Sequence, residues 1–424
     1  MHSTISRKNG SLLLEEVALS DIAQQYGTPC YVYSKLAIEQ NYEAYKEALG
    51  NQAHLVCYAV KSNSNLAVLQ TLVDLGSGFD IVSVGELERV LLAGGDASKV
   101  VFSGLGKTSH EMQRALDVGI QCFNVESESE LELLNRVAGQ MNKKAPVSIR
   151  VNPDVDAKTH PYISTGLKED KFGIDIDQAL NVYTRAVSMD NINIIGIDCH
   201  IGSQITEAKP FVDTLKRLLE LVDELNDRDI ELHHIDIGGG LGVRYQDEEI
   251  QPIKELLAEI KALLSDRTLT LIVEPGRSLT ANAGVLLTQV LYLKSTQYKQ
   301  FAVVDAAMND MLRPSLYQAW MDVQPVEQRD KNLTATYDVV GPICESGDFL
   351  AKERSLAIDE GDLLCLFSAG SYGFVMSSNY NSRPRVAEIM VDGSDTHVIR
   401  QRENFNDLIK GEKLLPKSHP TTSE

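Results

Sequence analysis

The most constraining feature of the sequence is a regular alternation of short apolar runs with longer amphipathic segments. The segments between the runs place apolar residues three or four positions apart, as amphipathic helices do, for example over residues 85–92, 127–141, 176–189, 211–225 and 250–264. Eight apolar runs have the length of buried strands, and they cover residues 55–60, 79–82, 100–103, 121–125, 147–151, 194–199, 232–237 and 271–273. Continuous apolar strands suit a parallel sheet buried on both faces, so eight such repeats predict a (β/α)8 barrel. A doubly wound open sheet is the alternative arrangement of the same elements.

The alternation of strand and helix patterns ends after Gly276. Short β-rich runs without long helices between them follow at residues 284–294, 301–306, 336–340, 363–367, 386–391 and 396–400. We therefore expect a barrel over residues 31–277 and a C-terminal all-β domain, a sandwich or barrel-like fold, over residues 278–424. Residues 307–328 are expected to interrupt that domain as a helical or looping insertion, and residues 1–30 to pack on it.

Charge and cysteine usage restrict the partners and the compartment. The formal net charge of -20 argues against nucleic acid and anionic membrane as partners, because both are negatively charged. No apolar run approaches the roughly 18 residues that span a bilayer. Six cysteines stand without paired spacing and the first residues lack the apolar core of a signal peptide, which together predict a cytoplasmic protein.

Lys61 is the first candidate for chemistry. It follows the apolar run at residues 55–60 and precedes a helical pattern that begins at Leu66, so it lies where a strand passes into a loop. Taken alone, it is more simply a solvated surface lysine. Burial of the ammonium would lower the pKa of Lys61, and the neutral amine that forms a Schiff base would then be available near neutral pH.

Polar residues collect at the carboxyl ends of the predicted strands, where the active site of a (β/α)8 barrel lies. They are Lys61, Asp80, Arg150, His200, Ser203, the triplet Gly238, Gly239 and Gly240, and Glu274, Gly276 and Arg277. Each has an ordinary alternative: a tight turn for the glycines, a hydrogen-bonded core histidine for His200, and an ion pair between Arg277 and Glu274.

Together these residues match the requirements of a pyridoxal-phosphate site. Lys61 offers the amine for the cofactor aldehyde, and the backbone N–H groups of the glycine triplet face a phosphate position. Glu274 is the candidate carboxylate for the pyridine nitrogen, where it would keep that nitrogen protonated so that the ring accepts electrons.

The sequence closely resembles the bacterial diaminopimelate decarboxylases, which are barrel-type pyridoxal-phosphate enzymes. The resemblance extends over residues 12–416 and rests on several motifs. They are Tyr58-Ala59-Val60-Lys61, His200-Ile201-Gly202-Ser203-Gln204, Gly238-Gly239-Gly240-Leu241-Gly242, Glu274-Pro275-Gly276-Arg277, Cys344-Glu345-Ser346-Gly347-Asp348 and Gly370-Ser371-Tyr372-Gly373. Ser371 stands where the family pattern has alanine.

The resemblance implies a role for each motif residue. Lys61 would bind the cofactor as an internal aldimine, Asp80 would belong to the cofactor site, and His200 would stack on the ring. The phosphate would be held by Ser203, the amides of Gly238, Gly239 and Gly240, the Gly276-Arg277 turn and Tyr372. Arg277, Arg313, Tyr317 and Tyr372 would bind the substrate, with the two arginines on its distal carboxylate, and Glu345 would accept from its distal ammonium.

The resemblance further implies that meso-diaminopimelate is decarboxylated to L-lysine by a homodimer with shared active sites. Cys344 would donate a proton to the α-carbon and would come from the partner chain; an inert buried thiol is the alternative. The insertion around His160–Gly166, with Lys168 and Lys171, is longer than an ordinary loop of the barrel and is interpreted as a lid.

Three other functions remain open at this point. A decarboxylase of ornithine, arginine or a related basic amino acid would need acids around the substrate tail where Arg277, Arg313 and Tyr317 are expected. A non-catalytic pyridoxal-phosphate-binding barrel would have no use for Cys344 and Glu345. A racemase of the alanine-racemase kind would need a tyrosine base in place of Cys344.

Overall fold

The structure is a computed structural model, and it describes residues 4–155, 170–329 and 334–416. The predicted lid falls within residues 156–169, outside the described residues, apart from Lys171. Among the residues described, no helix is both long enough and apolar enough to cross a lipid bilayer.

Eight parallel strands form a closed barrel. They are β5 (His54–Ala59), β6 (Gly78–Ile81), β7 (Val100–Phe102), β8 (Cys122–Val125), β9 (Ala145–Asn152), β11 (Ile192–Asp198), β12 (His234–Asp236) and β13 (Thr270–Val273). Strand β13 pairs with β5, and β8 pairs with β9 with Phe123 opposite Val147, so the sheet has no free edge among these strands. The predicted barrel is therefore confirmed and the open sheet is excluded.

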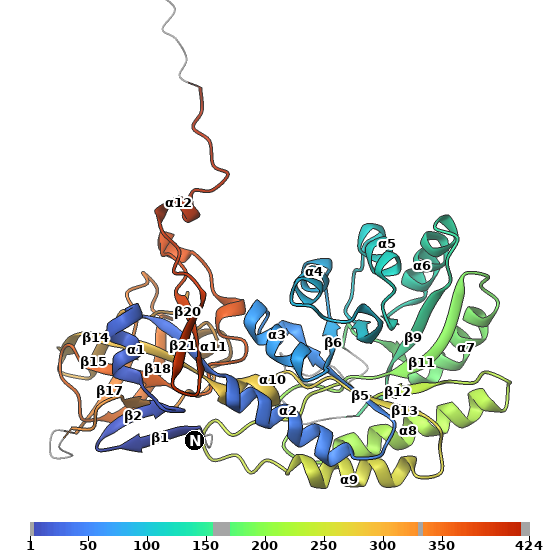
Figure 1. The fold of residues 1–424 in the computed structure, drawn as a ribbon, viewed down its shortest axis with the longest axis horizontal. Coiled ribbons are helices and arrows are strands. Elements are labelled where there is room, and N and C mark those ends of the chain that lie inside the picture. Colours follow the sequence, from blue (N-terminus) through green and yellow to red (C-terminus); the bar gives the residue numbers. More distant parts are fainter. Residues whose placement is uncertain (1–3, 156–169, 330–333, 417–424) are drawn as a thin grey trace, which may run out of the picture.

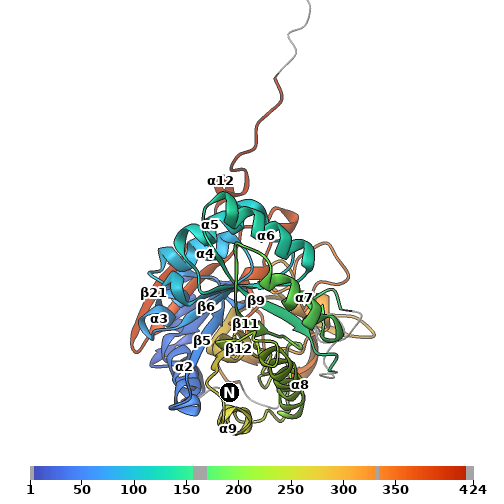
Figure 2. The same ribbon diagram turned by 90° about the vertical axis from the view of Figure 1, so that its right-hand side faces the viewer.

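Helices surround the barrel, as the view along it shows (Figure 2). They are α2 (Lys35–Leu49), α3 (Leu66–Asp74), α4 (Val84–Leu92), α5 (Ser109–Val118), α6 (Glu128–Gln140), α7 (Ile176–Val187), α8 (Lys209–Asn226) and α9 (Ile253–Leu264). Each turns its apolar stripe inward; in α8, for example, Leu215, Leu218 and Leu225 are fully buried. The strands are buried on both faces for this reason.

A second, largely antiparallel sheet lies beside the barrel (Figure 1). Its strands are β4 (Cys30–Ser34), β14 (Gly284–Ser295), β15 (Gln300–Val304), β16 (Val323–Pro325), β17 (Ala335–Val340), β18 (Phe349–Leu356), β19 (Leu363–Leu366), β20 (Ala387–Asp392) and β21 (Asp395–Arg400). The expected separate all-β domain is present. Within residues 307–328, a short helix α11 (Arg313–Tyr317) precedes β16.

Strand β4 belongs to this second sheet, because it pairs with β14 and β20. The boundary expected at residue 31 falls inside β4, and α2 is the first element that packs along the barrel. The earlier residues form a small sheet of β1 (Ile5–Lys8), β2 (Ser11–Leu14) and β3 (Val17–Ala18), followed by α1 (Leu19–Tyr26). Leu12, Leu14 and Ile22 pack there against Val285 and Ile389.

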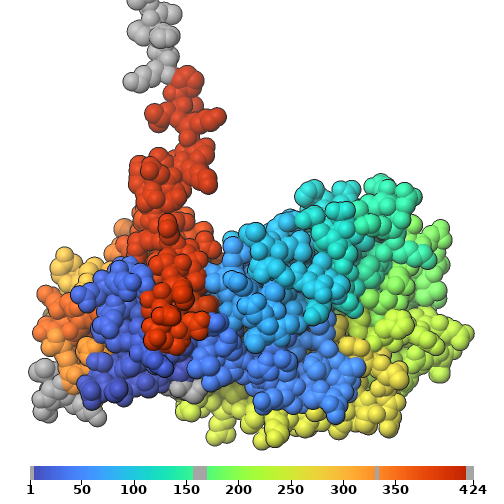
Figure 3. Space-filling view, viewed as in Figure 1, coloured from blue at the N-terminus to red at the C-terminus, as the bar shows by residue number. Residues whose placement is uncertain are grey.

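The chain joins the two halves twice. Strand β4 runs directly into α2, and a short helix α10 (Arg277–Thr280) follows Glu274, Pro275 and Gly276 after the last barrel strand. The carboxyl ends of the barrel strands therefore lie beside the second sheet. After β21 the chain leaves the body of the protein, passes through a short helix α12 (Phe405–Leu408) and projects outward up to residue 416 (Figure 3).

Candidate active site

A cavity of about 340 Å³ opens at the carboxyl ends of the barrel strands, next to the second sheet. Predicted site residues from both halves of the chain line it: Lys61, His200, Ser203, Arg277, Arg313, Tyr317 and Tyr372. The structure therefore brings together seven residues that sequence analysis had placed in one site.

Lys61 lies in a single helical turn, η1 (Val60–Ser62), directly after β5. Its ammonium forms an ion pair with the fully buried carboxylate of Asp80 on β6. Burial would lower the pKa of Lys61, but the charges of Asp80 and Glu274 outweigh it, and the pKa is raised. The expectation of a lowered pKa is therefore wrong, because two carboxylates face the amine.

Glu274 follows β13 and is buried, with Ser103 Oγ donating to its Oε1 at 3.4 Å. Burial raises the pKa of Glu274 well above its ordinary range, and the nearby carboxylates of Asp236, Asp80 and Asp198 raise it further. The ion pair between Glu274 and Arg277, the ordinary alternative for these two residues, is not among the contacts of the described residues. Arg277 is directed instead toward the cavity.

The glycine triplet is packed too closely for side chains. A Cβ atom on Gly239 would lie 2.1 Å from the carbonyl oxygen of Glu274, and Gly238 has a φ of +67°, which other residues rarely adopt. The N–H of Gly239 donates to Nδ1 of His200 at 3.2 Å. The loop therefore holds the His200 ring while it keeps its backbone close to the strand ends.

His200 is held as a neutral imidazole. Burial lowers the pKa of His200 well below its ordinary value, and the positive charges of Arg150 and Lys61 lower it further. A neutral, flat ring at the cavity wall is suited to stacking on an aromatic cofactor.

Cationic and hydroxyl donors occupy one side of the cavity. Arg277 is buried and donates to Ser203 Oγ at 3.0 Å and to the Tyr245 hydroxyl at 2.6 Å. Its guanidinium also lies 4.9 Å from the centre of the Tyr372 ring. Tyr372 has a φ of +55°, a conformation that is unusual for a non-glycine residue and is concentrated at functional sites.

Arg313 begins helix α11 and is also buried, with its guanidinium 4.6 Å from the centre of the Tyr245 ring. Burial lowers the pKa of Arg313, and the charge of Arg277 lowers it further. Two buried arginines in one cavity provide strong donors for an anionic group.

Tyr245, which contacts both arginines, was not predicted from the sequence. It lies in the long segment between β12 and α9, where no periodic pattern marks which side chains point inward. Asp198 and Asp236 were also missed as site residues, although each lies one residue before the end of a predicted strand and so carried a signal similar to that of Asp80 and Glu274. Trp320 and Glu248 further line the cavity.

Cys344 and Glu345 lie outside this cavity. They belong to the connection between β17 and β18, where both are exposed and neither lines the cavity with Lys61. The N–H of Cys344 donates to Asn381 at 3.0 Å, and the Tyr380 hydroxyl donates to Glu345. The other five cysteines are buried, and none of the six forms a disulfide.

The residues present fit pyridoxal phosphate. Lys61 supplies an amine, Glu274 a carboxyl group, and His200 a flat neutral ring. Ser203, Arg277 and the glycine loop, which has no room for side chains, supply donors and a close backbone approach for a phosphate. These features define a barrel-type pyridoxal-phosphate enzyme.

Comparisons with known proteins agree with this class and narrow it. The family model for the pyridoxal-binding domain of the pyridoxal-dependent decarboxylases matches residues 35–281. The diaminopimelate decarboxylase of Pseudomonas aeruginosa is 62% identical over 97% of this chain and 99% of its own. The chain belongs to the diaminopimelate decarboxylase family, and pyridoxal phosphate is the cofactor of that family.

Solved structures show the same relationship. The diaminopimelate decarboxylase of M. jannaschii, solved in complex with L-lysine, is 37% identical, with a TM-score of 0.93 over 98% of this chain and 99% of that one. The Helicobacter pylori enzyme, also solved with L-lysine, is 41% identical, with a TM-score of 0.89 over 92% of this chain and 98% of that one.

Proposed function

We propose that this protein decarboxylates meso-2,6-diaminopimelate to L-lysine and carbon dioxide with pyridoxal phosphate as its cofactor. The observation that carries the proposal is that Lys61 and two buried arginines open into the same cavity. Such a cavity suits a substrate that keeps a second carboxylate at its far end after the first one leaves.

We assign the cofactor-binding roles as follows. Lys61 binds the cofactor aldehyde, and Asp80 holds the Lys61 side chain at the cavity wall. Glu274 faces the ring nitrogen and His200 stacks on the ring. Ser203, the Gly276-Arg277 turn, Tyr372 and the amide of Gly240 bind the phosphate. The amides of Gly238 and Gly239, which the sequence also assigned to the phosphate, donate instead to Asp236 and to His200.

Bound pyridoxal phosphate supplies an electron-accepting ring for the pair left when the bond from the α-carbon to the carboxylate breaks. The protein supplies the surroundings. Arg277 and Arg313, with Tyr317, orient the distal carboxylate, and their low exposure strengthens that contact because water competes less. Cys344 donates a proton to the α-carbon and Glu345 accepts from the distal ammonium.

We infer that Cys344 and Glu345 act in the cavity of a second copy of this chain in a homodimer. The support is their position: both are exposed and away from the cavity that Lys61 lines in the same chain.

Six free thiols further support the expectation of a reducing, cytoplasmic compartment.

A side-by-side substrate assay tests the proposed reaction. Purified protein and pyridoxal phosphate are incubated separately with meso-diaminopimelate, ornithine and arginine, and the carbon dioxide and the amine products are identified. We expect L-lysine from diaminopimelate and little product from the other two, because neither has a distal carboxylate for Arg277 and Arg313. Faster release from ornithine or arginine would refute the assignment.

A further inference from the structure

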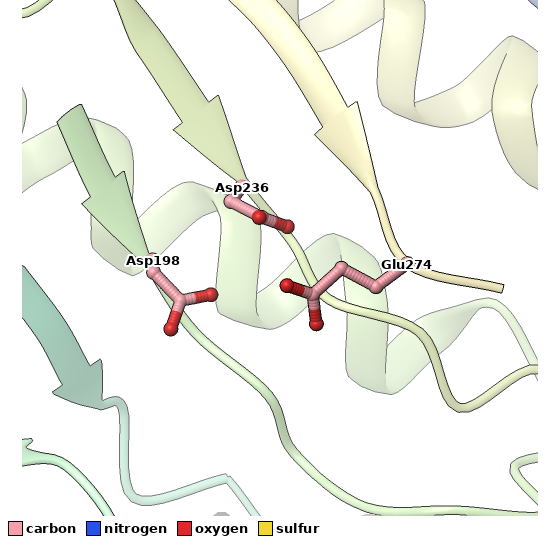
Figure 4. A group of neighbouring side chains, drawn as sticks. All are labelled: Asp198, Asp236 and Glu274. Atoms are coloured by element: carbon pink, nitrogen blue, oxygen red, sulfur yellow. The ribbon is translucent and has the colours of Figure 1, made fainter. Parts of the chain in front are cut away.

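Three buried carboxyl groups lie together beneath the cavity, and we call them the carboxyl triad. Asp198, Asp236 and Glu274 stand at the ends of the neighbouring strands β11, β12 and β13 and point toward one another (Figure 4). One oxygen of each lies within 4.8 Å of the others, and each residue is at most 5% exposed.

Positive charge near the carboxyl triad is already shared with other acids. The guanidinium of Arg150 is 3.9 Å from Asp198, but it also donates to Glu126 at 2.8 Å. Lys61 forms its ion pair with Asp80. Arg150 and Lys61 are therefore shared with two further carboxyl groups, Glu126 and Asp80, besides the three of the triad. Full ionisation of the triad would leave uncompensated buried charge.

Hydrogen bonding compensates only part of this charge. The N–H of Gly238 donates to Asp236 Oδ1 at 2.8 Å, whereas Asp198 Oδ1 and Asp236 Oδ2 are buried without a hydrogen-bond partner. Burial raises the pKa of Asp236 to about 7 and, together with the charge of Asp236, raises the pKa of Asp198. A proton shared among close carboxyl groups is the usual outcome of such crowding.

We propose that the carboxyl triad holds a proton in common and delivers it through Glu274 to the ring nitrogen of the cofactor. The inference rests on the proposed function, in which Glu274 faces that nitrogen. One O–H bond of the triad breaks and one N–H bond forms, so the triad gains a negative charge as the ring gains a positive one. Asp198 and Asp236 are positioning residues, because they act through Glu274.

Other titratable and charged groups surround the carboxyl triad from each packed element. They are Cys57 on β5 and Lys61 after it, Asp80 on β6, Cys122 on β8 and Glu126 after it, Arg150 on β9, Cys199 and His200 after β11, and His234 on β12. Burial raises the pKa of each of these three cysteines and lowers the pKa of His200 and of His234, so these five groups remain uncharged near neutral pH. The shared proton is therefore confined to carboxyl groups.

The protonation of the ring nitrogen can be followed directly in the holoenzyme with cofactor labelled by nitrogen-15 in the ring. In Asp198→Asn and Asp236→Asn, loss of a neighbouring negative charge should lower the apparent pKa of that nitrogen by about one unit, and by more in the double variant. Glu130→Gln, which alters a buried carboxyl that pairs with Lys107 instead, is the matched control and should leave it unchanged. An unchanged ring pKa in folded, cofactor-loaded Asp198→Asn and Asp236→Asn would overturn the proposal.

A second measurement needs no substitution. Calorimetry in buffers of different ionisation enthalpy counts the protons taken up when the wild-type protein binds pyridoxal phosphate, at a pH where the free cofactor ring is unprotonated. The same measurement is made with an analogue that has carbon in place of the ring nitrogen. If the triad supplies the proton, the protein should take up the same number of protons from solution with either compound. One additional proton taken up with pyridoxal phosphate would refute the proposal.

Glu274→Gln separates this inference from the proposed function. If the apparent pKa of the ring nitrogen is unchanged in Glu274→Gln, Glu274 does not face that nitrogen and the proposed assignment fails. If this pKa changes in Glu274→Gln but not in the two aspartate variants, only the role proposed for the carboxyl triad is refuted.

Discussion

At the scale of single residues, the chemistry depends first on the protonation state of the Lys61 amine. The ammonium is stabilised by Asp80 and Glu274, so the amine is charged in the protein by itself. The amine must lose its proton to bind an aldehyde. Asp80 is the carboxylate that pairs directly with this ammonium, and its second oxygen is buried without a hydrogen-bond partner.

Lys61→Ala should abolish turnover and the visible absorbance of the lysine-bound cofactor. No other lysine lines the described part of the cavity, so no second amine can take its place. Absorbance spectra after dialysis and an assay for carbon dioxide release measure both effects. A variant that kept the absorbance would show that another residue binds the aldehyde.

Arg313→Ala should weaken the use of diaminopimelate much more than it weakens cofactor binding. Losing one charge-assisted contact to a desolvated carboxylate costs on the order of 2–3 kcal/mol, or a fall in kcat/KM of roughly 30- to 150-fold. Arg329→Ala is the control, since that arginine pairs with Asp362 on the surface away from the cavity. Loss of pyridoxal phosphate with intact substrate binding would place Arg313 in the cofactor site.

At the scale of elements, the parallel strands determine where the chemistry collects. Each strand ends at the same rim, so single residues at eight positions become neighbours although they are far apart in sequence. The same arrangement crowds Asp198, Asp236 and Glu274, and their burial raises their pKa values. Folding therefore becomes sensitive to pH at this rim.

Asp236→Asn should change how stability depends on pH. The folded-state pKa of Asp236 is raised to about 7, so its folded form binds more protons than the unfolded chain between about pH 4 and 7. The stabilisation of the folded state by this bound proton is present at low pH. It is lost as pH rises through 7, where ionisation of the buried carboxyl group destabilises the fold.

Relative to wild type, the free energy of unfolding of Asp236→Asn should therefore rise by on the order of 1–3 kcal/mol from pH 4 to 7. Urea unfolding without added cofactor measures this difference. Asp213→Asn is the control, because Lys209 lowers the pKa of that surface carboxyl and its effect has the opposite sign. A constant difference between Asp236→Asn and wild type would contradict a raised pKa.

The elements that the sequence predicted share continuous apolar content. The eight barrel strands could be located because burial on both faces leaves little room for polar residues. Strand β18 was not predicted, because Lys352, Glu353 and Arg354 interrupt its apolar pattern at the edge of the sheet. Tyr245 was missed since side-chain direction in a loop depends on tertiary contacts, and the pKa of Lys61 was misjudged because it depends on charges from two other strands.

At the scale of the whole molecule, one chain does not place all the proposed catalytic groups in one cavity. Lys61 lines the cavity beside the second sheet, whereas Cys344 is exposed on that sheet's β17–β18 connection. A two-fold dimer can bring Cys344 of one chain to Lys61 of the other, because such an interface exchanges equivalent surfaces. Each of the two sites would then need both chains.

Mixed dimers test this arrangement. Lys61→Ala and Cys344→Ala, each inactive or nearly so by itself, are dissociated together and re-associated in equal amounts. Random pairing makes half of the dimers mixed, and by two-fold symmetry each mixed dimer has one site with both defects and one with neither, so about a quarter of all sites should recover. If the two residues of one chain shared a site, every site would carry a defect. Activity no higher than that of the two parents, with mixed dimers shown to be present, would therefore rule out a site built from two chains.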